Sequence, residues 1–168
     1  MSGWVALLRA VNVGGNNKLP MAELKTLCED LGLERVQTYI ASGNVVFESG
    51  RSAADLLNGI EAALGQHYGK PLGVMVRSAA ELAGLVAGNP WPDRPGNRVV
   101  AIFIDGPLSL DGITGQRGET VALGSRAIYV DYHAGMADTR LRIPAAKLGT
   151  ARNMNTVTRL AAMAGALG

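Results

Sequence analysis

The sequence has little of what several common kinds of protein site require. It contains one cysteine, Cys28, among 168 residues, so it can form neither an intramolecular disulfide nor a metal site built from several cysteines. Cys28 lies among leucines at helical spacing, which predicts a small buried apolar residue. The two histidines, His67 and His133, are isolated and match no metal-binding spacing. We therefore expect no metal centre and assign no cofactor.

Aromatic side chains and net charge are also scarce. Aromatic residues make up 5% of the chain, which disfavours proteins that stack single-stranded bases on aromatic rings. Lys and Arg number 16 against 14 Asp and Glu, and a net charge of +2 gives no strong field toward nucleic acid or membrane. No apolar run reaches the roughly 18 residues of a membrane span, and no secretory signal opens the chain. We expect a soluble cytoplasmic protein without a membrane partner.

What the chain has is a pattern of short apolar segments separated by glycine-rich turns. Apolar residues make up 48% of the sequence and charged residues 18%, which predicts a folded core. The expected elements of the first half are a strand over 4–11, a helix over 20–32, strands over 36–41 and 45–48, a helix over 53–67 and a strand over 72–77. This β-α-β-β-α-β order is the ferredoxin-like signature.

The second half resembles a degenerate copy of the same plan, without its fourth strand and with an extra C-terminal helix. Its expected elements are a strand over 99–104, a short helix or turn near 108–113, strands over 120–123 and 127–132, a helix over 140–148 interrupted by Pro144, and a helix over 153–167.

A helix over 78–86, with Ser78 and Glu81 at capping-box spacing, follows the first plan. The stretch 88–97 holds three of the seven prolines and is predicted as a linker. We therefore predict an α+β protein of two ferredoxin-like α/β subdomains. The first covers residues 1–87 with the connecting helix, and the second covers residues 98–168.

Polar residues gather at two turns that this topology places at one end of the first sheet. The turn after the first strand and the Ser42-Gly43-Asn44 turn should lie side by side, next to the start of the first helix, whose N–H groups favour an anion. The glycines would let the backbone approach a ligand, or would only form tight turns. The candidate residues here are Arg9, Asn12, Gly14, Gly15, Asn16, Lys18, Ser42, Gly43 and Asn44.

A second polar cluster covers residues 150–156, at the start of the last predicted helix. Arg152, Asn153 and Asn155 are rich in hydrogen-bond donors and could hold an oxyanion, completing the first cluster. The alternative is that these residues only cap the helix.

The segments LLRAVNVGGNNKLPMAELKTLCEDLGLERVQTYIASGNVVF and GTARNMNTVTRL resemble a bacterial family of uncharacterised proteins, the domain of unknown function 1697 family. Two positions depart from that family: Met154 stands where tryptophan is usual, and Asn89-Pro90-Trp91 stands for Asn-Pro-Phe. The resemblance implies two related α/β subdomains. It implies no activity, so no catalytic residue is carried over.

These observations predict a protein that binds a small anionic ligand carrying a phosphate or carboxylate, a nucleotide among them. Whether it is an enzyme stays open, because no nucleophile–base pair and no Gly-x-Ser-x-Gly motif is visible. The alternatives are a nucleic-acid-binding module, against which charge and aromatic content count, and an interaction module, such as a homodimer, without catalysis.

Overall fold

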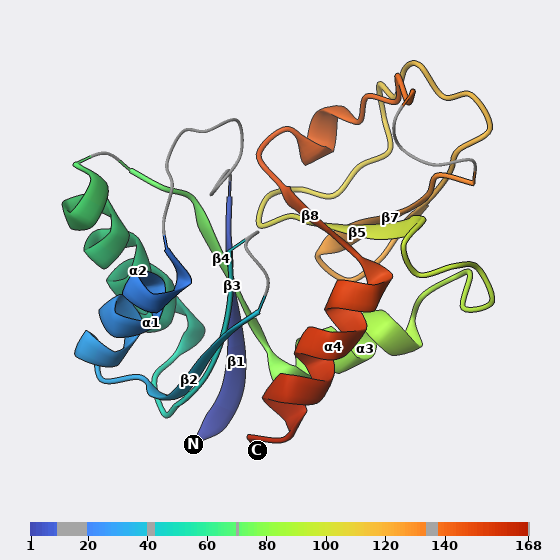
Figure 1. Cartoon of the computed structure of the whole chain (residues 1–168). Helices are drawn as coiled ribbons and strands as arrows, with labels where there is room; N and C mark the ends of the chain where they lie inside the picture. The colour runs from blue at the N-terminus through green and yellow to red at the C-terminus, as the bar shows by residue number, and fades with distance from the viewer. Residues whose placement is uncertain (10–19, 40–42, 70, 134–137, 168) are drawn as a thin grey trace. The chain divides into compact units, whose positions relative to one another are not determined.

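The computed structural model describes residues 1–9, 20–39, 43–69, 71–133 and 138–167 (Figure 1). The contacts of the chain form two compact units. The first unit comprises Met1–Ala80 and Leu160–Gly168, and the second comprises Glu81–Arg159. The fold is α+β, as predicted, with one four-stranded antiparallel sheet in each unit.

The first unit has the predicted β-α-β-β-α-β order, and its sheet has the strand order β2-β3-β1-β4. Helices α1 and α2 lie together against one face of this sheet (Figure 1). The elements are β1 Ser2–Leu8, α1 Met21–Asp30, β2 Glu34–Tyr39, β3 Asn44–Ser49, α2 Ala53–Tyr68 and β4 Val74–Ser78.

Local chemistry accounts for where these helices begin and end. The hydroxyl of Ser52 accepts a hydrogen bond from the Asp55 amide and so caps α2, and Gly69 ends the helix in the left-handed conformation that glycine tolerates. Leu24 and Cys28 of α1 pack with Phe47 of β3 in the core between the helices and the sheet. The sequence pattern therefore predicted both helices and the burial of Cys28 on α1.

The second unit repeats the order of strands, with β6-β7-β5-β8 in its sheet. Helix α3 crosses the boundary between the units, and α4 begins in the second unit and ends in the first. The elements are α3 Ala79–Ala87, β5 Val99–Phe103, β6 Thr120–Leu123, β7 Ala127–Asp131, the 3₁₀ helix η1 Pro144–Ala146, β8 Thr150–Asn153 and α4 Met154–Gly165.

The structure corrects two expectations for the second half. The predicted helix over 140–148 is only the 3₁₀ turn η1, because Pro144 has no N–H group to donate inside a longer helix. The fourth strand, predicted to be missing, is present as β8, which pairs with β5 and ends where α4 begins. The second unit therefore has all four strands of the first unit's plan but differs from it in its helices. Residues 105–119, between β5 and β6, form a loop in place of a helix.

Loop residues cover the sheet face that helices would otherwise protect. Leu108 and Leu110 from one loop, and Leu141 and Ile143 from another, pack against buried strand residues such as Ile128. The second unit thus buries one sheet face without helices like α1 and α2. The predicted linker at 88–97 contains no helix or strand.

Candidate functional site

One end of the first sheet brings Arg9, Gly43 and Asn44 together. Asn44 pairs with Leu7 in the ladder between β1 and β3, and the Leu8 amide donates to the Gly43 carbonyl at 2.9 Å. Arg9 follows directly, and its amide donates to the Gly73 carbonyl, also at 2.9 Å. Gly43, directly before β3, therefore lies beside the end of β1. The other candidates, Asn12, Gly14, Gly15, Asn16, Lys18 and Ser42, lie outside the described residues.

Two glycines at this end of the sheet are needed for its conformation and packing. Gly43 has φ of 83°, a left-handed conformation that most side chains avoid. At Gly73 an added Cβ would stand 3.0 Å from the Arg9 Cδ atom, so glycine leaves room for the arginine stem. The Asn44 side chain is fully buried, and its Nδ2 donates to the Tyr39 carbonyl at 2.9 Å across the turn. Asn44 therefore ties the start of β3 to the end of β2.

In the second polar cluster, Asn153 caps the last helix, and Arg152 forms further hydrogen bonds. The Asn153 Oδ1 accepts from the Thr156 amide at 2.9 Å and caps α4. Arg152 is buried, with an exposed fraction of 7%, and its Nη1 donates to the Thr150 hydroxyl at 2.7 Å and the Ala151 carbonyl at 2.9 Å. Burial lowers the pKa of Arg152 to about 10.

Asn155, the third residue of this cluster, lines a cavity of about 240 Å³ in the second unit. Its Oδ1 lies against Gly96, where an added Cβ would come within 2.1 Å of that oxygen. Arg94 lines the same cavity, and its Nε donates to the Asp131 Oδ2 at 3.0 Å. The full lining is Val86, Asn89, Pro92, Arg94, Gly96, Met154, Asn155 and Thr158.

Arg94 and Asn89 were not among the site residues predicted from the sequence. Both lie in the proline-rich stretch that was predicted only as a linker. The available signal was the Asn89-Pro90 pair, one of the words shared with the family that the sequence resembles. The predicted site residues are thus divided between the units: Arg9, Gly43 and Asn44 belong to the first, and Arg152, Asn153 and Asn155 to the second.

Each histidine has an acidic neighbour. His67 Nε2 lies 3.3 Å from Glu23 Oε2, beside a mostly apolar groove along α1. His133 Nε2 lies 2.9 Å from the Thr120 hydroxyl and 3.5 Å from Asp131 Oδ2. A hydroxyl–imidazole–carboxylate relay needs the two oxygens on opposite ring nitrogens, so these three residues do not form one. Among the described residues, no three His, Cys, Asp or Glu side chains cluster as metal ligands would.

Cys28 is a core residue, as predicted. Its exposed fraction is 1%, and burial, assisted by the charge of Glu29, raises the pKa of the thiol to about 12. Within the part of the chain that the structure describes, no helix has the length and apolar content needed to cross a membrane.

The comparisons with known proteins agree with the fold and leave the activity open. A family model described as "Protein of unknown function (DUF1697)" matches residues 1–129. The structure of the conserved bacterial protein SP0830 from Streptococcus pneumoniae is similar to this chain at 27% identity and a TM-score of 0.78, over 96% of this chain and 98% of that one. No curated protein matches. The second of the two segments that resemble the family, residues 149–160, lies beyond the range that the family model matches.

Proposed function

We propose that this chain, which belongs to the DUF1697 family of proteins of unknown function, is a cytoplasmic protein that binds a small anionic molecule at the end of its first sheet. The supporting observation is the register between β1 and β3. It sets Asn44 opposite Leu7 and the Gly43 carbonyl on the Leu8 amide, immediately before Arg9. The positively charged Arg9 therefore follows β1 at the end of the sheet where the sequence predicted an anion-binding site.

The chemistry of that end favours an anion. A guanidinium binds carboxylate and phosphate through two parallel N–H groups, which a neutral ligand would not use as well. Gly43 and Gly73 keep the surrounding backbone free of Cβ atoms. The proposed ligand carries a phosphate or a carboxylate, and nucleotides belong to this class. We propose binding and assign no reaction.

A thermal-shift screen of nucleotides and phosphorylated or carboxylated metabolites tests this proposal on the full chain. A ligand at ten times its Kd should raise the unfolding midpoint by about 3–6 °C. The Arg9→Ala variant should lose that shift, whereas Arg51→Ala, which removes an exposed arginine of the same unit, should keep it. The proposal fails if every anion that stabilises the wild type stabilises Arg9→Ala equally.

A further inference from the structure

We propose that the cavity between the 89–96 segment and the start of α4 is a second binding site, specific for a small oxyanion, with Arg94 as its principal ligand. The oxyanion is a carboxylate or a phosphate group. This site goes beyond the proposed function, because it lies in the second unit and uses none of Arg9, Gly43 and Asn44.

The residues that line the cavity offer donors for an anion. Arg94 contributes a guanidinium, Asn89 and Asn155 contribute side-chain amides, and Thr158 contributes a hydroxyl. None of the described residues lining the cavity is an aspartate or a glutamate. A cation would find no carboxylate on the cavity wall, whereas an oxyanion would find a guanidinium, whose charge Asp131 offsets in part, and several neutral donors.

Arg94 is held in place by a buried carboxylate. The Arg94 Nε donates to Asp131 Oδ2, and Asp131 has a side-chain exposure of only 1%. The other carboxylate oxygen, Oδ1, accepts from the His133 amide at 2.9 Å, so Asp131 itself is fixed. This bond uses one edge of the guanidinium, and the two Nη groups are the donors that Arg94 offers to a ligand.

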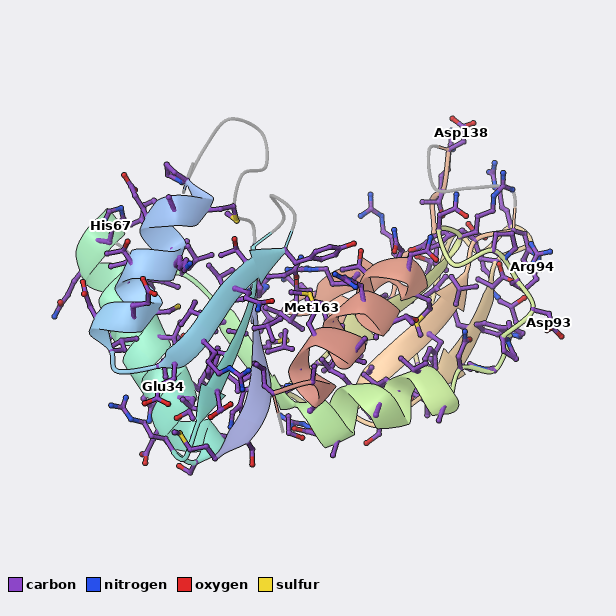
Figure 2. The ribbon with its side chains drawn as sticks, turned by 60° about the horizontal axis from the view of Figure 1, so that its bottom comes forward. Glu34, His67, Asp93, Arg94, Asp138 and Met163 are labelled. Atoms are coloured by element: carbon purple, nitrogen blue, oxygen red, sulfur yellow. The ribbon has the colours of Figure 1, made fainter. Side chains whose placement is uncertain are left out.

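Solvent can reach this arginine. The Arg94 side chain is 40% exposed, so a ligand can approach it. Figure 2 shows Arg94 and Asp93 at the same edge of the second unit, with the Asp93 side chain at the periphery. Asp93 does not line the cavity.

The two asparagines are oriented by contacts of their own. The Asn89 Oδ1 accepts from the Trp91 amide at 3.0 Å, which leaves the amide nitrogen as its donor. Asn155 places its Oδ1 against Gly96, and its Nδ2 is the donor that remains. Both asparagines therefore offer a side-chain N–H group to an oxyanion in the cavity.

The backbone at the start of α4 has its own partners. The amides of Met154 and Asn155 donate to the Gly96 carbonyl, and Asn153 accepts from the Thr156 amide. The helix end thus contributes little beyond its dipole.

The size of the cavity restricts the ligand. At about 240 Å³ it is smaller than the roughly 300–1,000 Å³ of pockets that bury drug-sized molecules. It can take an oxyanion with a few attached atoms, and a larger ligand would insert only its acidic group.

The experiment is a titration of the ¹⁵N-labelled full chain with sodium phosphate and, separately, sodium acetate, followed through the side-chain amide signals of Asn89 and Asn155. We expect a saturable shift of both signals with at least one of the two anions. If phosphate binds more tightly than acetate, the natural ligand carries a phosphoryl group. If acetate binds more tightly, the natural ligand carries a carboxylate. Arg94→Gln should weaken binding about tenfold or more, and Arg94→Lys should fall between it and the wild type.

Two control variants make the result specific. Arg159→Gln removes an exposed arginine of α4 that does not line the cavity, and it should change the affinity less than about twofold. Arg9→Ala should leave this titration unchanged, which separates the second site from the proposed function. If Arg94→Gln proves unfolded, Thr158→Val, which removes a lining hydroxyl, takes its place and should also weaken binding. The proposal is overturned if neither anion gives a saturable shift of these amides, or if Arg159→Gln weakens binding as much as Arg94→Gln.

Discussion

Arg77 and Arg152 occupy the same position in the two four-stranded sheets. Each is the penultimate residue of the fourth strand, β4 or β8, and a helix begins two residues later. Arg77 pairs with Val5 of β1, and Arg152 pairs with Ala101 of β5, so each lies on an edge strand beside the equivalent inner strand of its sheet. Both are buried, with exposed fractions of 1% and 7%, which is rare for arginine. The two units therefore share their strand order and also a buried arginine at the equivalent position of the fourth strand.

This equivalence predicts parallel effects of substitution. Arg77→Ala and Arg152→Ala should each lower the free energy of unfolding by about 2–4 kcal/mol, because each removes a long buried side chain. Arg77→Met and Arg152→Met should cost less, since methionine restores most of the packing of the arginine stem. Urea denaturation measures both pairs, with the exposed Arg159→Ala as control. A methionine variant as unstable as its alanine counterpart would show that the guanidinium, and not the stem, supplies the stability.

A side chain at Gly96 should displace Asn155. A Cβ at this position would come within 2.1 Å of Asn155 Oδ1, the end of an exposed side chain that can move aside, so Gly96→Ala should lower the free energy of unfolding by at most about 1 kcal/mol. It should also weaken oxyanion binding, because it displaces Asn155. Gly106→Ala is the matched control: nothing lies within 4 Å of the added atom, and stability should stay level or rise by up to about 1 kcal/mol. Equal stability of the two variants would contradict the tight contact between Gly96 and Asn155.

Asn153 should matter as a helix cap. Asn153→Ala removes the bond to the Thr156 amide and should lower the free energy of unfolding by about 1 kcal/mol. Asn153→Asp keeps an acceptor, adds a charge that the start of the helix favours, and should retain the wild-type stability. Thermal or urea unfolding of the two variants decides the matter. If the aspartate variant is as unstable as the alanine variant, the amide nitrogen of Asn153 has a role that capping does not explain.

Glu119 should make stability depend on acid pH. The Thr139 hydroxyl donates to its Oε2 at 2.6 Å and the Arg117 amide donates to its Oε1, and these bonds lower the pKa of the carboxyl from its ordinary value of 4.5. The folded protein then holds the proton less readily than the unfolded chain, so this contribution is complete well above pH 4.5 and is lost as the pH falls through the lowered pKa.

The Glu119→Gln variant provides the measurement. Its unfolding midpoint should lie below that of the wild type at neutral pH, and the gap should shrink progressively once the pH falls below 4.5. Glu29→Gln, which changes an exposed carboxylate of α1, should show a smaller gap. A gap between wild type and Glu119→Gln that is unchanged between pH 7 and pH 3 would exclude the ionised form of Glu119 as the stabilising one.

Much of the fold follows from the sequence because its signals are local. The apolar run that forms β1 is buried from Val5 to Leu8, as its nearly continuous apolar residues predicted. Helical spacing placed Leu24 and Cys28 on the core side of α1, and the Gly43 turn follows from a conformation that glycine favours. The juxtaposition of Arg9 and Asn44 also follows, because the strand order of a β-α-β-β-α-β unit determines which turns are neighbours.

The tertiary structure alone decided the rest. The segment Thr150–Asn153 has no apolar alternation, and it becomes strand β8 only because the edge of β5 offers hydrogen-bond partners to its backbone. Burial of Arg152 follows from that pairing. Arg94 and Asn155 are distant in sequence and line one cavity only because the Gly96 carbonyl binds the first amides of α4. The sequence by itself determined most of the strands, turns and helices, since these depend on neighbouring residues, and β8 and the 3₁₀ helix η1 are the exceptions. Which polar side chains meet depended on contacts between distant segments, which no local pattern encodes.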